Sequence, residues 1–552
     1  MNRNGFTVMH QLVGLVFPLL HVMFIAIAFG VVGFLCAIFI TILSSMALLK
    51  GIGLPISLSF EQLFLLIAVC AIFRGVLRYI EQASNHYIAF KLLALIRHKV
   101  FVKLRSLAPA KLEGRNSGDL ISLITSDIEL LEVFYAHTIS PIMIAIIVSI
   151  IMTVFIAQYH ILLGLIALLA YLTVGLFLPL YFGKKGRNVG QDYRERYAKM
   201  NGFILDSLQG IKDSIQYNHA PSRMDEMNIR MSNIEDAQTK LKHLEAKSYA
   251  TSDMSVLFFS SLVMMTGVYL YQIQQINLIG LVISGVAMIS SFGPVVALSN
   301  LSNNLHHTLA SGNRLLDLLE EEPKVLDIKG QKEAQYGDIV LDNVSFSYQD
   351  EMVVEDINLV IPQHKIIGIH GKSGSGKSTL LKLMMRFFET TKGNITLNNR
   401  SINEVNTSDL RDMEAYVIQE TYLFNDTIAN NIALGKPEAS LEEIKVAAKK
   451  ASIDEFIDSL PDGYMSQVGE LGSLLSEGQK QRIGIARAFL HDLKIIFLDE
   501  PTSNLDSLNE AVILKSLKDE SEGKTIVIVS HRDSTMSIVD DVFEMNAGNL
   551  HR

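Results

Sequence analysis

The sequence contains no tryptophan and only two cysteines, Cys36 and Cys70, both inside long apolar runs. So few cysteines exclude a disulfide scaffold and a cysteine-rich metal site. Charged residues make up only 19% of the chain, whereas an ordinary soluble domain carries about 25%. The net charge of −9 provides no basic face for nucleic acid, so we expect no nucleic-acid partner. Hydrophobic residues reach 49%, which indicates a chain that lies partly in a lipid bilayer.

Long apolar runs dominate the first half of the chain, and each is long enough to cross a bilayer at about 20 residues per helix. They predict six transmembrane helices, at about 15–48, from 61 to about 74–86, and at 139–157, 161–182, 251–271 and 278–298. The first run is about twice as long as the ~7–15-residue apolar core of a cleaved signal peptide. We therefore interpret it as a retained helix.

Basic residues are concentrated in two of the loops. The loop after the second span carries Lys91, Arg97, Lys99, Lys103, Arg105, Lys111 and Arg115, and the loop after the fourth carries Lys184, Lys185, Arg187, Arg194, Arg196 and Lys199. Cytoplasmic loops carry an excess of lysine and arginine. We therefore expect a multi-pass membrane protein with both termini and both long loops in the cytoplasm.

The pattern changes near residue 337, where short β-branched strands begin to alternate with helices, as in an α/β domain. Before that point, apolar residues in the two long loops recur at helix spacing, which predicts that several spans continue as helices into the cytoplasm. The sequence thus predicts a transmembrane domain of six helices with long cytoplasmic extensions (1–322), a linker (323–336) and an α/β domain (337–552).

A phosphate-binding loop stands between an apolar strand at 365–370 and a helix that begins at Thr379. The loop consists of Gly371, Lys372, Ser373, Gly374, Ser375, Gly376, Lys377 and Ser378. Its glycines let backbone N–H groups surround phosphates, and the helix adds the positive end of its dipole. We expect Lys377 to reach the β- and γ-phosphates of ATP and Ser378 to bind Mg²⁺, with Thr379 in the same ATP-binding set. A chance match in a flexible loop is disfavoured by this strand–loop–helix frame.

Two adjacent carboxylates end a second apolar strand, at 495–498. We expect Asp499 to hold Mg²⁺ and Glu500 to be the base that orients the attacking water. A solvated turn is the alternative, and the P-loop elsewhere in the domain counts against it.

Residues 337–552 resemble the ATPase domain of the ABC transporter family through six motifs in family order. The resemblance implies ATP hydrolysis coupled to transport. It assigns adenine stacking to Tyr348, Mg²⁺ sensing to the Q-loop residue Gln419, the signature motif to Ser476, Glu477, Gly478 and Gln479, the D-loop to 503–506 with Asp506, and the γ-phosphate switch to His531.

The segment 466–470 resembles one that is peculiar to exporter-type ABC proteins, which also join six spans to a following ATPase domain. Because the working unit of that family has two ATPase domains, the chain resembles a half-transporter. The segments 117–121 and 206–217 would hold the coupling helices that contact the ATPase domains.

The signature motif has Glu477 where the family has glycine. In the family, each ATP lies between the P-loop of one chain and the signature of the other, so a carboxylate there adds like charge and bulk. A homodimer would carry this defect at both sites, which favours a heterodimer with a second, different half-transporter. The alternative is that Glu477 points away and is tolerated.

Polar residues at 74, 78, 81–82 and 85–86 share one face of the second span. Arg74, Arg78 and His86 are candidates to bind a substrate or haem, because intramembrane ionisable groups normally face a cavity or one another. The alternative is a helix that is leaving the membrane, with His86 packed on its surface. Around Arg78 the sequence resembles the CydC subunit of bacterial CydDC-type transporters, which implies export of a small thiol, such as cysteine or glutathione, or of a haem-related compound. Import or flipping of an amphipathic molecule, multidrug export and a regulatory subunit with little turnover are the other possibilities.

Overall fold

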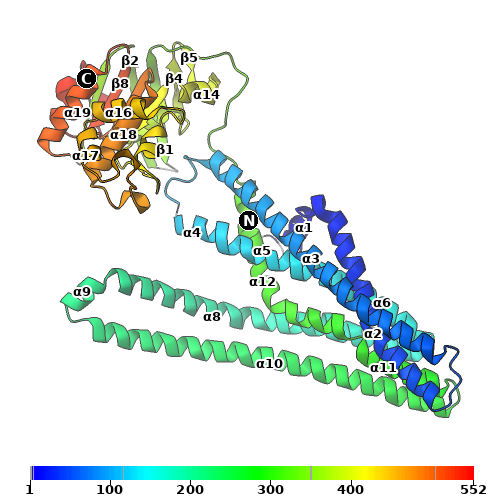
Figure 1. Cartoon of the computed structure of the whole chain (residues 1–552). Coiled ribbons are helices and arrows are strands. Elements are labelled where there is room, and N and C mark those ends of the chain that lie inside the picture. Colours follow the sequence, from blue (N-terminus) through cyan, green and yellow to red (C-terminus); the bar gives the residue numbers. More distant parts are fainter. Residues whose placement is uncertain (1–2, 4, 116, 349–350, 504) are drawn as a thin grey trace. The chain divides into compact units, whose positions relative to one another are not determined.

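The computed structural model describes residues 3, 5–115, 117–348, 351–503 and 505–552, which separate into two compact units (Figure 1). The membrane unit comprises the described residues up to Lys103 together with Arg115–Glu321. The ATPase unit comprises Leu104–Gly114 and Glu322–Arg552. This division differs from the sequence-based boundaries chiefly in Leu104–Gly114, a loop of the membrane domain by sequence that packs with the ATPase unit.

Helices build the membrane unit. In chain order they are α1 (Gly5–Gly14), η1 (Phe17–Leu19), α2 (Leu20–Gly51), α3 (Phe60–Leu107), α4 (Ser117–Ser122), η2 (Leu123–Asp127), α5 (Ile128–Phe134), η3 (Tyr135–Ile139), α6 (Ser140–Ala157), α7 (Ile161–Leu172), η4 (Thr173–Phe177), α8 (Leu178–Gln209), α9 (Ile211–Gln216), α10 (Ala220–Gln272), α11 (Leu278–Ser290) and α12 (Gly293–Glu320).

Six helical stretches of the described residues are long and apolar enough to cross a membrane, which confirms the predicted number. They cover Phe17–Gly51, Phe60–Leu107, Ser140–Ala157, Ile161–Gln209, Ala220–Gln272 and Leu278–Leu298. The second, fourth and fifth are 48, 49 and 53 residues long. At 1.5 Å per residue, such helices reach far beyond a hydrocarbon core of ~30 Å, as the predicted extensions require.

Capping side chains fix where some of these helices begin, and small residues let them pack closely. The Asn277 side chain caps α11 by accepting a hydrogen bond from Gly280 N at 2.7 Å, and His160 caps α7 in the same way. Gly30 lets α2 pack closely, because a Cβ there would overlap Ile144 and lie 3.3 Å from the Glu81 carboxyl carbon. The core of the unit is aliphatic and lies between α2, α6, α7, α10 and α11.

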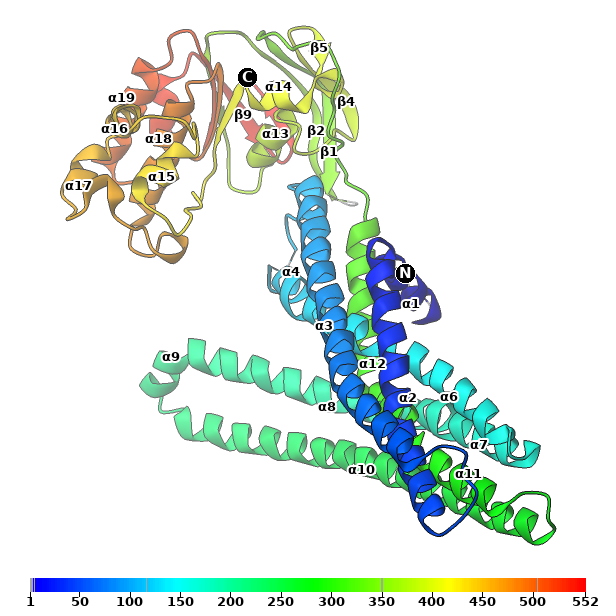
Figure 2. The same cartoon turned by 45° about the vertical axis from the view of Figure 1, so that its right-hand side comes forward.

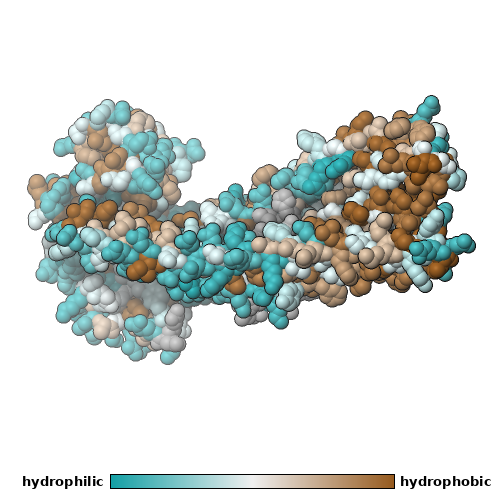
Figure 3. All heavy atoms as spheres, turned by 90° about the horizontal axis from the view of Figure 1, so that it is seen from below, coloured by the Kyte–Doolittle hydropathy of each residue, from teal (hydrophilic) through white to brown (hydrophobic). Residues whose placement is uncertain are grey.

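The helices α8 and α10 lie side by side as a long hairpin with α9 at its tip (Figures 1 and 2). Space-filling colours show hydrophobic side chains gathered at the end of the helical bundle away from α9, and hydrophilic ones over the long extensions (Figure 3). This separation is the one expected of helices that cross a bilayer and continue into water.

The ATPase unit contains two sheets. The antiparallel sheet has the order β2 (Glu351–Ile361), β1 (Ile339–Tyr348), β4 (Lys392–Leu397) and β5 (Arg400–Ser401). The second sheet has the order β10 (Asn549–His551), β9 (Asp541–Asn546), β3 (Ile366–His370), β8 (Thr525–Ser530), β7 (Ile495–Asp499) and β6 (Glu414–Val417). Its pairs from β9 to β6 are parallel.

The helices of this unit are α13 (Lys377–Met384), α14 (Thr407–Arg411), α15 (Ile428–Ala433), α16 (Leu441–Lys450), α17 (Asp454–Asp458), α18 (Glu477–His491) and α19 (Ser507–Asp519). Because β3, β8, β7 and β6 are parallel neighbours, their carboxyl ends lie along one edge of the sheet. Ligands bind at that edge in open α/β sheets. The P-loop, His531, the pair Asp499–Glu500 and Gln419 all follow these strands, so the topology alone brings them together.

Candidate ATP site

The P-loop turns sharply between β3 and α13. Gly374 and Gly376 have φ angles of +79° and +103°, a left-handed backbone that glycine adopts without strain. A Cβ on Gly376 would also lie 2.7 Å from Val353 O. The backbone N–H groups at the start of α13 are therefore free to face a phosphate group.

Lys377 is held inside this loop. Its ammonium donates hydrogen bonds of 2.8 Å to the carbonyl oxygens of Gly371 and Lys372. Burial lowers the pKa of Lys377, and the nearby carboxylates of Glu500 and Asp499 oppose that shift. The ammonium thus lies near the two carboxylates and at the end of the phosphate-binding loop.

Asp499 has the surroundings of a magnesium ligand. Ser378 Oγ donates to its Oδ1 at 2.9 Å, and the Tyr416 hydroxyl donates to its Oδ2 at 3.2 Å. Burial raises the pKa of Asp499, while these two hydrogen bonds counteract that rise. A carboxylate and a hydroxyl oxygen in direct contact at a phosphate-binding helix are a donor set that suits Mg²⁺, so the residues present fit the ion.

Glu500 is the centre of a second set of contacts. Its Oε1 lies 3.0 Å from His531 Nδ1, and its Oε2 accepts a hydrogen bond from Gln419 Nε2 at 3.2 Å. Gln481 Nε2 donates to the main-chain oxygen of Glu500 at 2.8 Å. Glu500 itself has a φ of +47°, a conformation that non-glycine residues adopt rarely and mostly at functional sites. Two side chains therefore contact the carboxylate of Glu500, and a third contacts its main chain.

Sequence reasoning assigned no role to Tyr416 or Gln481. Tyr416 lies on β6 and reaches Asp499 across the sheet, and Gln481 lies on α18 with only 1% of its surface exposed. Both stand next to recognised motifs, three residues before Gln419 and two after Gln479. Proximity to a motif is the only signal that the sequence offered.

The signature residues stand at the start of α18. Ser476 Oγ accepts from Gln479 N, and the Gln479 side chain accepts from Ser476 N at 2.8 Å, which forms a capping box. Glu477 occupies the first turn, with 59% of its side chain exposed and its Oε1 2.9 Å from Lys480 Nζ. The carboxylate is therefore accessible to another molecule, and Lys480 partly balances its charge.

Two other predicted residues have local partners. The Tyr348 ring packs on Phe346 and Phe388, with centroid distances of 4.9 and 5.3 Å. Asp506 caps α19 by accepting hydrogen bonds from Leu508 N and Asn509 N at 3.1 and 3.0 Å. Asn504 of the D-loop lies outside the described residues.

The segment Leu104–Gly114 packs on the ATPase unit. Ala110 belongs to its hydrophobic core, and Glu113 forms an ion pair with Lys382 on α13. The predicted coupling segment 117–121 corresponds to α4, which follows this docking segment rather than forming it. The second predicted segment, 206–217, covers the end of α8 and all of α9.

Comparison with known proteins identifies the family. A model of the ABC transporter transmembrane region matches residues 18–295, and a model of the ABC transporter ATPase matches residues 354–503. A Haemophilus influenzae protein named "Probable ABC transporter ATP-binding/permease protein" is 49% identical over 100% of both chains. The chain belongs to the ABC transporter family. Its ATPase domain therefore hydrolyses ATP in coupling to transport.

Two further comparisons describe the transporter more closely. It is 31% identical to the ATP-dependent lipid A-core flippase of Desulfotalea psychrophila, over 91% of this chain and 88% of the flippase. The structure of a bacterial Atm1-family ABC exporter with ATP bound matches with a TM-score of 0.83 at 22% identity, covering 96% and 93% of the two chains. This likeness shows that the fold is that of an ABC exporter. Nothing in these matches points to CydC in particular.

The geometry explains how the transporter acts on ATP. We propose that backbone N–H groups of the P-loop and Lys377 bind and orient the phosphates. Ser378 and Asp499 would hold Mg²⁺, which would supply positive charge beside the phosphate oxygens. Glu500 would take the proton of the attacking water, with its carboxylate held by His531 and Gln419.

The polar face of α3 combines buried and exposed residues. Its buried members are Glu81 and Asn85, each 2% exposed. Arg78 Nη1 donates to both Glu81 oxygens at 2.8 and 2.7 Å, so its charge is already paired. Arg74 is exposed, and His86 stacks on Phe90 with ring centroids 6.0 Å apart. Arg78 and Glu81 thus face each other on α3, one of the two arrangements that the sequence predicts for ionisable groups in a membrane.

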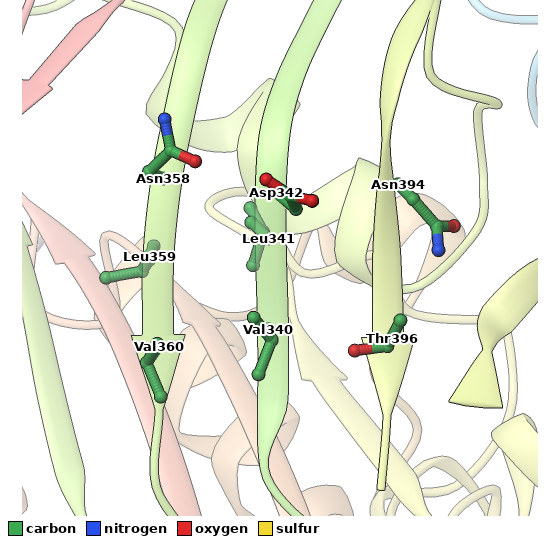
Figure 4. Close-up of a pocket in the computed structure, with 8 residues that line it drawn as sticks. All are labelled: Val340, Leu341, Asp342, Asn358, Leu359, Val360, Asn394 and Thr396. Atoms are coloured by element: carbon green, nitrogen blue, oxygen red, sulfur yellow. The ribbon is translucent and has the colours of Figure 1, made fainter. Parts of the chain in front are cut away.

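Two cavities of the transporter lie away from the ATP motifs. A hollow of about 430 Å³ on the antiparallel sheet is lined by residues of β1, β2 and β4, among them Asp342, Asn358 and Asn394 (Figure 4). A larger one of about 930 Å³ lies in the membrane unit, between α6, α7, α8 and α12. No residue of the ATP motifs lines either, so the larger cavity is a candidate for the transported molecule.

Proposed function

We propose that the chain is a half-transporter that pairs with a second half-transporter to export an amphipathic, largely apolar molecule. The observation that carries this proposal is the 930 Å³ cavity in the membrane unit, whose lining is mostly aliphatic. Binding sites for small molecules are typically concave and apolar with a few polar groups. The name of the flippase relative is consistent with such a substrate.

The small-thiol and haem classes predicted from the CydC resemblance receive less support. Thiols such as cysteine and glutathione are hydrophilic, and a mostly aliphatic wall offers them few hydrogen-bonding partners. The haem hypothesis rests on His86 alone, whose ring is stacked on Phe90. Flipping or multidrug export of an amphipathic molecule fits the cavity better.

An exposed apolar surface at the tip of the α8–α10 hairpin is evidence for a second subunit. It consists of Leu205, Leu208, Ile211, Ile215 and Tyr217, which are 48–75% exposed. Contiguous apolar side chains on a water-facing extension indicate a protein contact. We propose that the ATPase domain of the partner covers them in the cytoplasm, and the basic loops support the same location for the ATPase unit of this chain.

A heterodimer is proposed because of Glu477. Its carboxylate is exposed at the start of α18, where the signature of one chain faces the ATP held by the other. A partner with glycine at this position would complete the site that contains Lys377, Glu500 and His531. Its own P-loop would face Glu477 and form the weaker site.

Co-expression tests the pairing. The chain is purified alone and together with a half-transporter encoded beside its gene, and mass and ATPase activity are measured for both preparations in lipid nanodiscs. We expect high ATPase activity only in a complex with one copy of each chain, stimulated by apolar amphiphiles. A homodimer with full activity would contradict the heterodimer, and stimulation only by hydrophilic thiols would contradict the substrate class.

A further inference from the structure

The 930 Å³ cavity of the membrane unit is chemically asymmetric. Aliphatic side chains from α6 and from the stretch α7–α8 form its walls, including Ile146, Ile150, Leu172, Leu176 and Leu180. These five are 40–64% exposed, so the cavity is open and its walls have room for a ligand chain. An apolar ligand body would replace water along this whole surface.

The polar lining groups are few. Lys184 and Asn188 lie one helical turn apart on α8, hence on the same face. Within the described part of the chain, neither side chain has an ion pair or hydrogen bond to another residue. The other polar members of the lining are Ser149 on α6 and Tyr171 on α7, whose hydroxyl is hydrogen-bonded to Ser291. An unpaired ammonium and an unpaired amide are thus available at the end of an otherwise apolar cavity.

The position along the helix places this polar end in the membrane. Lys184 follows Ile161, the first residue of α7, by about 35 Å at ~1.5 Å per residue. The hydrocarbon core of a bilayer is ~30 Å thick. Lys184 therefore reaches the headgroup level on the side of the α8–α10 hairpin, while Leu172 and Leu176 remain within the hydrocarbon.

We propose that this cavity binds an amphipathic acid, with its anionic head group on Lys184 and Asn188 and its aliphatic chain along α6 and α7. The inference rests on the proposed function and adds the charge of the substrate and the leaflet from which it enters. The ligand enters from the leaflet on the side of the hairpin, because its head group binds at that level. A lysine ammonium and an amide N–H₂ are donors that suit a carboxylate or a phosphate monoester.

A helix of a second subunit would be the other occupant of an apolar groove. Such a helix would bury the Lys184 ammonium, and a buried charge without a partner is costly. An acid with a flexible chain satisfies the ammonium and fills the apolar walls at once, so charge complementarity favours the acid.

The test uses the purified complex in nanodiscs of neutral phosphatidylcholine. Binding of dodecyl phosphate, dodecanol and dodecyl trimethylammonium is measured by displacement of a fluorescent alkyl phosphate. The variants are Lys184→Gln and Lys184→Arg. The matched control is Lys185→Gln, which removes the adjacent charge outside the cavity lining.

We expect Lys184→Gln to weaken binding of dodecyl phosphate about tenfold or more and to leave dodecanol unchanged, because only the charged contact is lost. Lys184→Arg and Lys185→Gln should bind as the unmodified complex does. The proposal would be overturned if Lys184→Gln lost equal affinity for dodecyl phosphate and for dodecanol. It would also be overturned if Lys184→Gln kept its affinity for dodecyl phosphate. If dodecanol binds tightly and its affinity does not depend on Lys184, the substrate is not an acid. The proposed export of an amphipathic molecule would still hold.

A labelling experiment separates the ligand from a covering helix. Cys36 and Cys70 are replaced by alanine, Leu176 by cysteine, and the complex is treated with a membrane-permeant maleimide. We expect rapid labelling that dodecyl phosphate slows and dodecanol at the same concentration slows less. No labelling in the absence of ligand would show that a partner helix fills the cavity, and would overturn the proposal.

Discussion

Glu500 Oε1 and His531 Nδ1 lie 3.0 Å apart at the ends of two neighbouring parallel strands. The contact orients the carboxylate, and under our proposal the other ring nitrogen of His531 binds the γ-phosphate. Because β7 and β8 are hydrogen-bonded to each other, the pair depends on the sheet itself and not on a mobile loop.

Replacing Glu500 with glutamine should abolish hydrolysis while ATP still binds. The change keeps size and removes the anionic oxygen that accepts a proton from water, a role that contributes roughly 10²–10⁴-fold. Turnover and ATP affinity are measured on the assembled complex, with Glu522→Gln as a surface control. Turnover equal to that of the unmodified protein would show that Glu500 is not the base.

Replacing Glu477 with glycine should raise the ATPase activity of the complex. The change removes a carboxylate from the site that the partner's P-loop completes, whereas Glu477→Gln removes the charge and keeps the bulk. Loss of a first-turn carboxylate and of the pair with Lys480 costs α18 about 0.3–1 kcal/mol, so thermal stability is recorded alongside. Unchanged or lower activity would remove the main argument for a heterodimer.

Breaking the ion pair between Glu113 and Lys382 should uncouple the ATPase from its substrate. Lys382 lies one turn after Ser378 on α13, and its charge lowers the pKa of Asp499. Glu113→Gln and Lys382→Gln should each retain basal ATPase activity and lose substrate stimulation. The exchange Glu113→Lys with Lys382→Glu should restore part of it, and full stimulation in both single variants would contradict this role.

Replacing His86 with alanine should lower thermal stability modestly and leave substrate stimulation intact, because the ring packs on Phe90. Both quantities are measured on the same preparation. A selective loss of stimulation, or of a haem absorbance band, would instead restore His86 as a ligand.

The ATP site could be predicted from sequence because its motifs are contiguous. The glycine spacing of the P-loop and the two carboxylates after an apolar strand can each be recognised within a short stretch of sequence. The contacts Tyr416–Asp499 and Gln481–Glu500 could not be predicted, since they depend on strand order and on how α18 packs. The packing of Leu104–Gly114 on the ATPase unit could not be predicted either, because basic and helical patterns do not reveal which turn after α3 reaches the ATPase core. Arg78 was a substrate candidate by sequence, and in the structure it pairs with Glu81.

The central claim is ATP-driven movement of an amphipathic molecule, and transport in proteoliposomes tests it most directly. Complexes carrying unmodified chain or Glu500→Gln are reconstituted with outward-facing ATPase domains, and uptake of a fluorescent alkyl phosphate is followed after addition of Mg-ATP. We predict uptake that requires ATP and is lost in Glu500→Gln. Uptake without ATP, or equal uptake by the two complexes, would contradict the account.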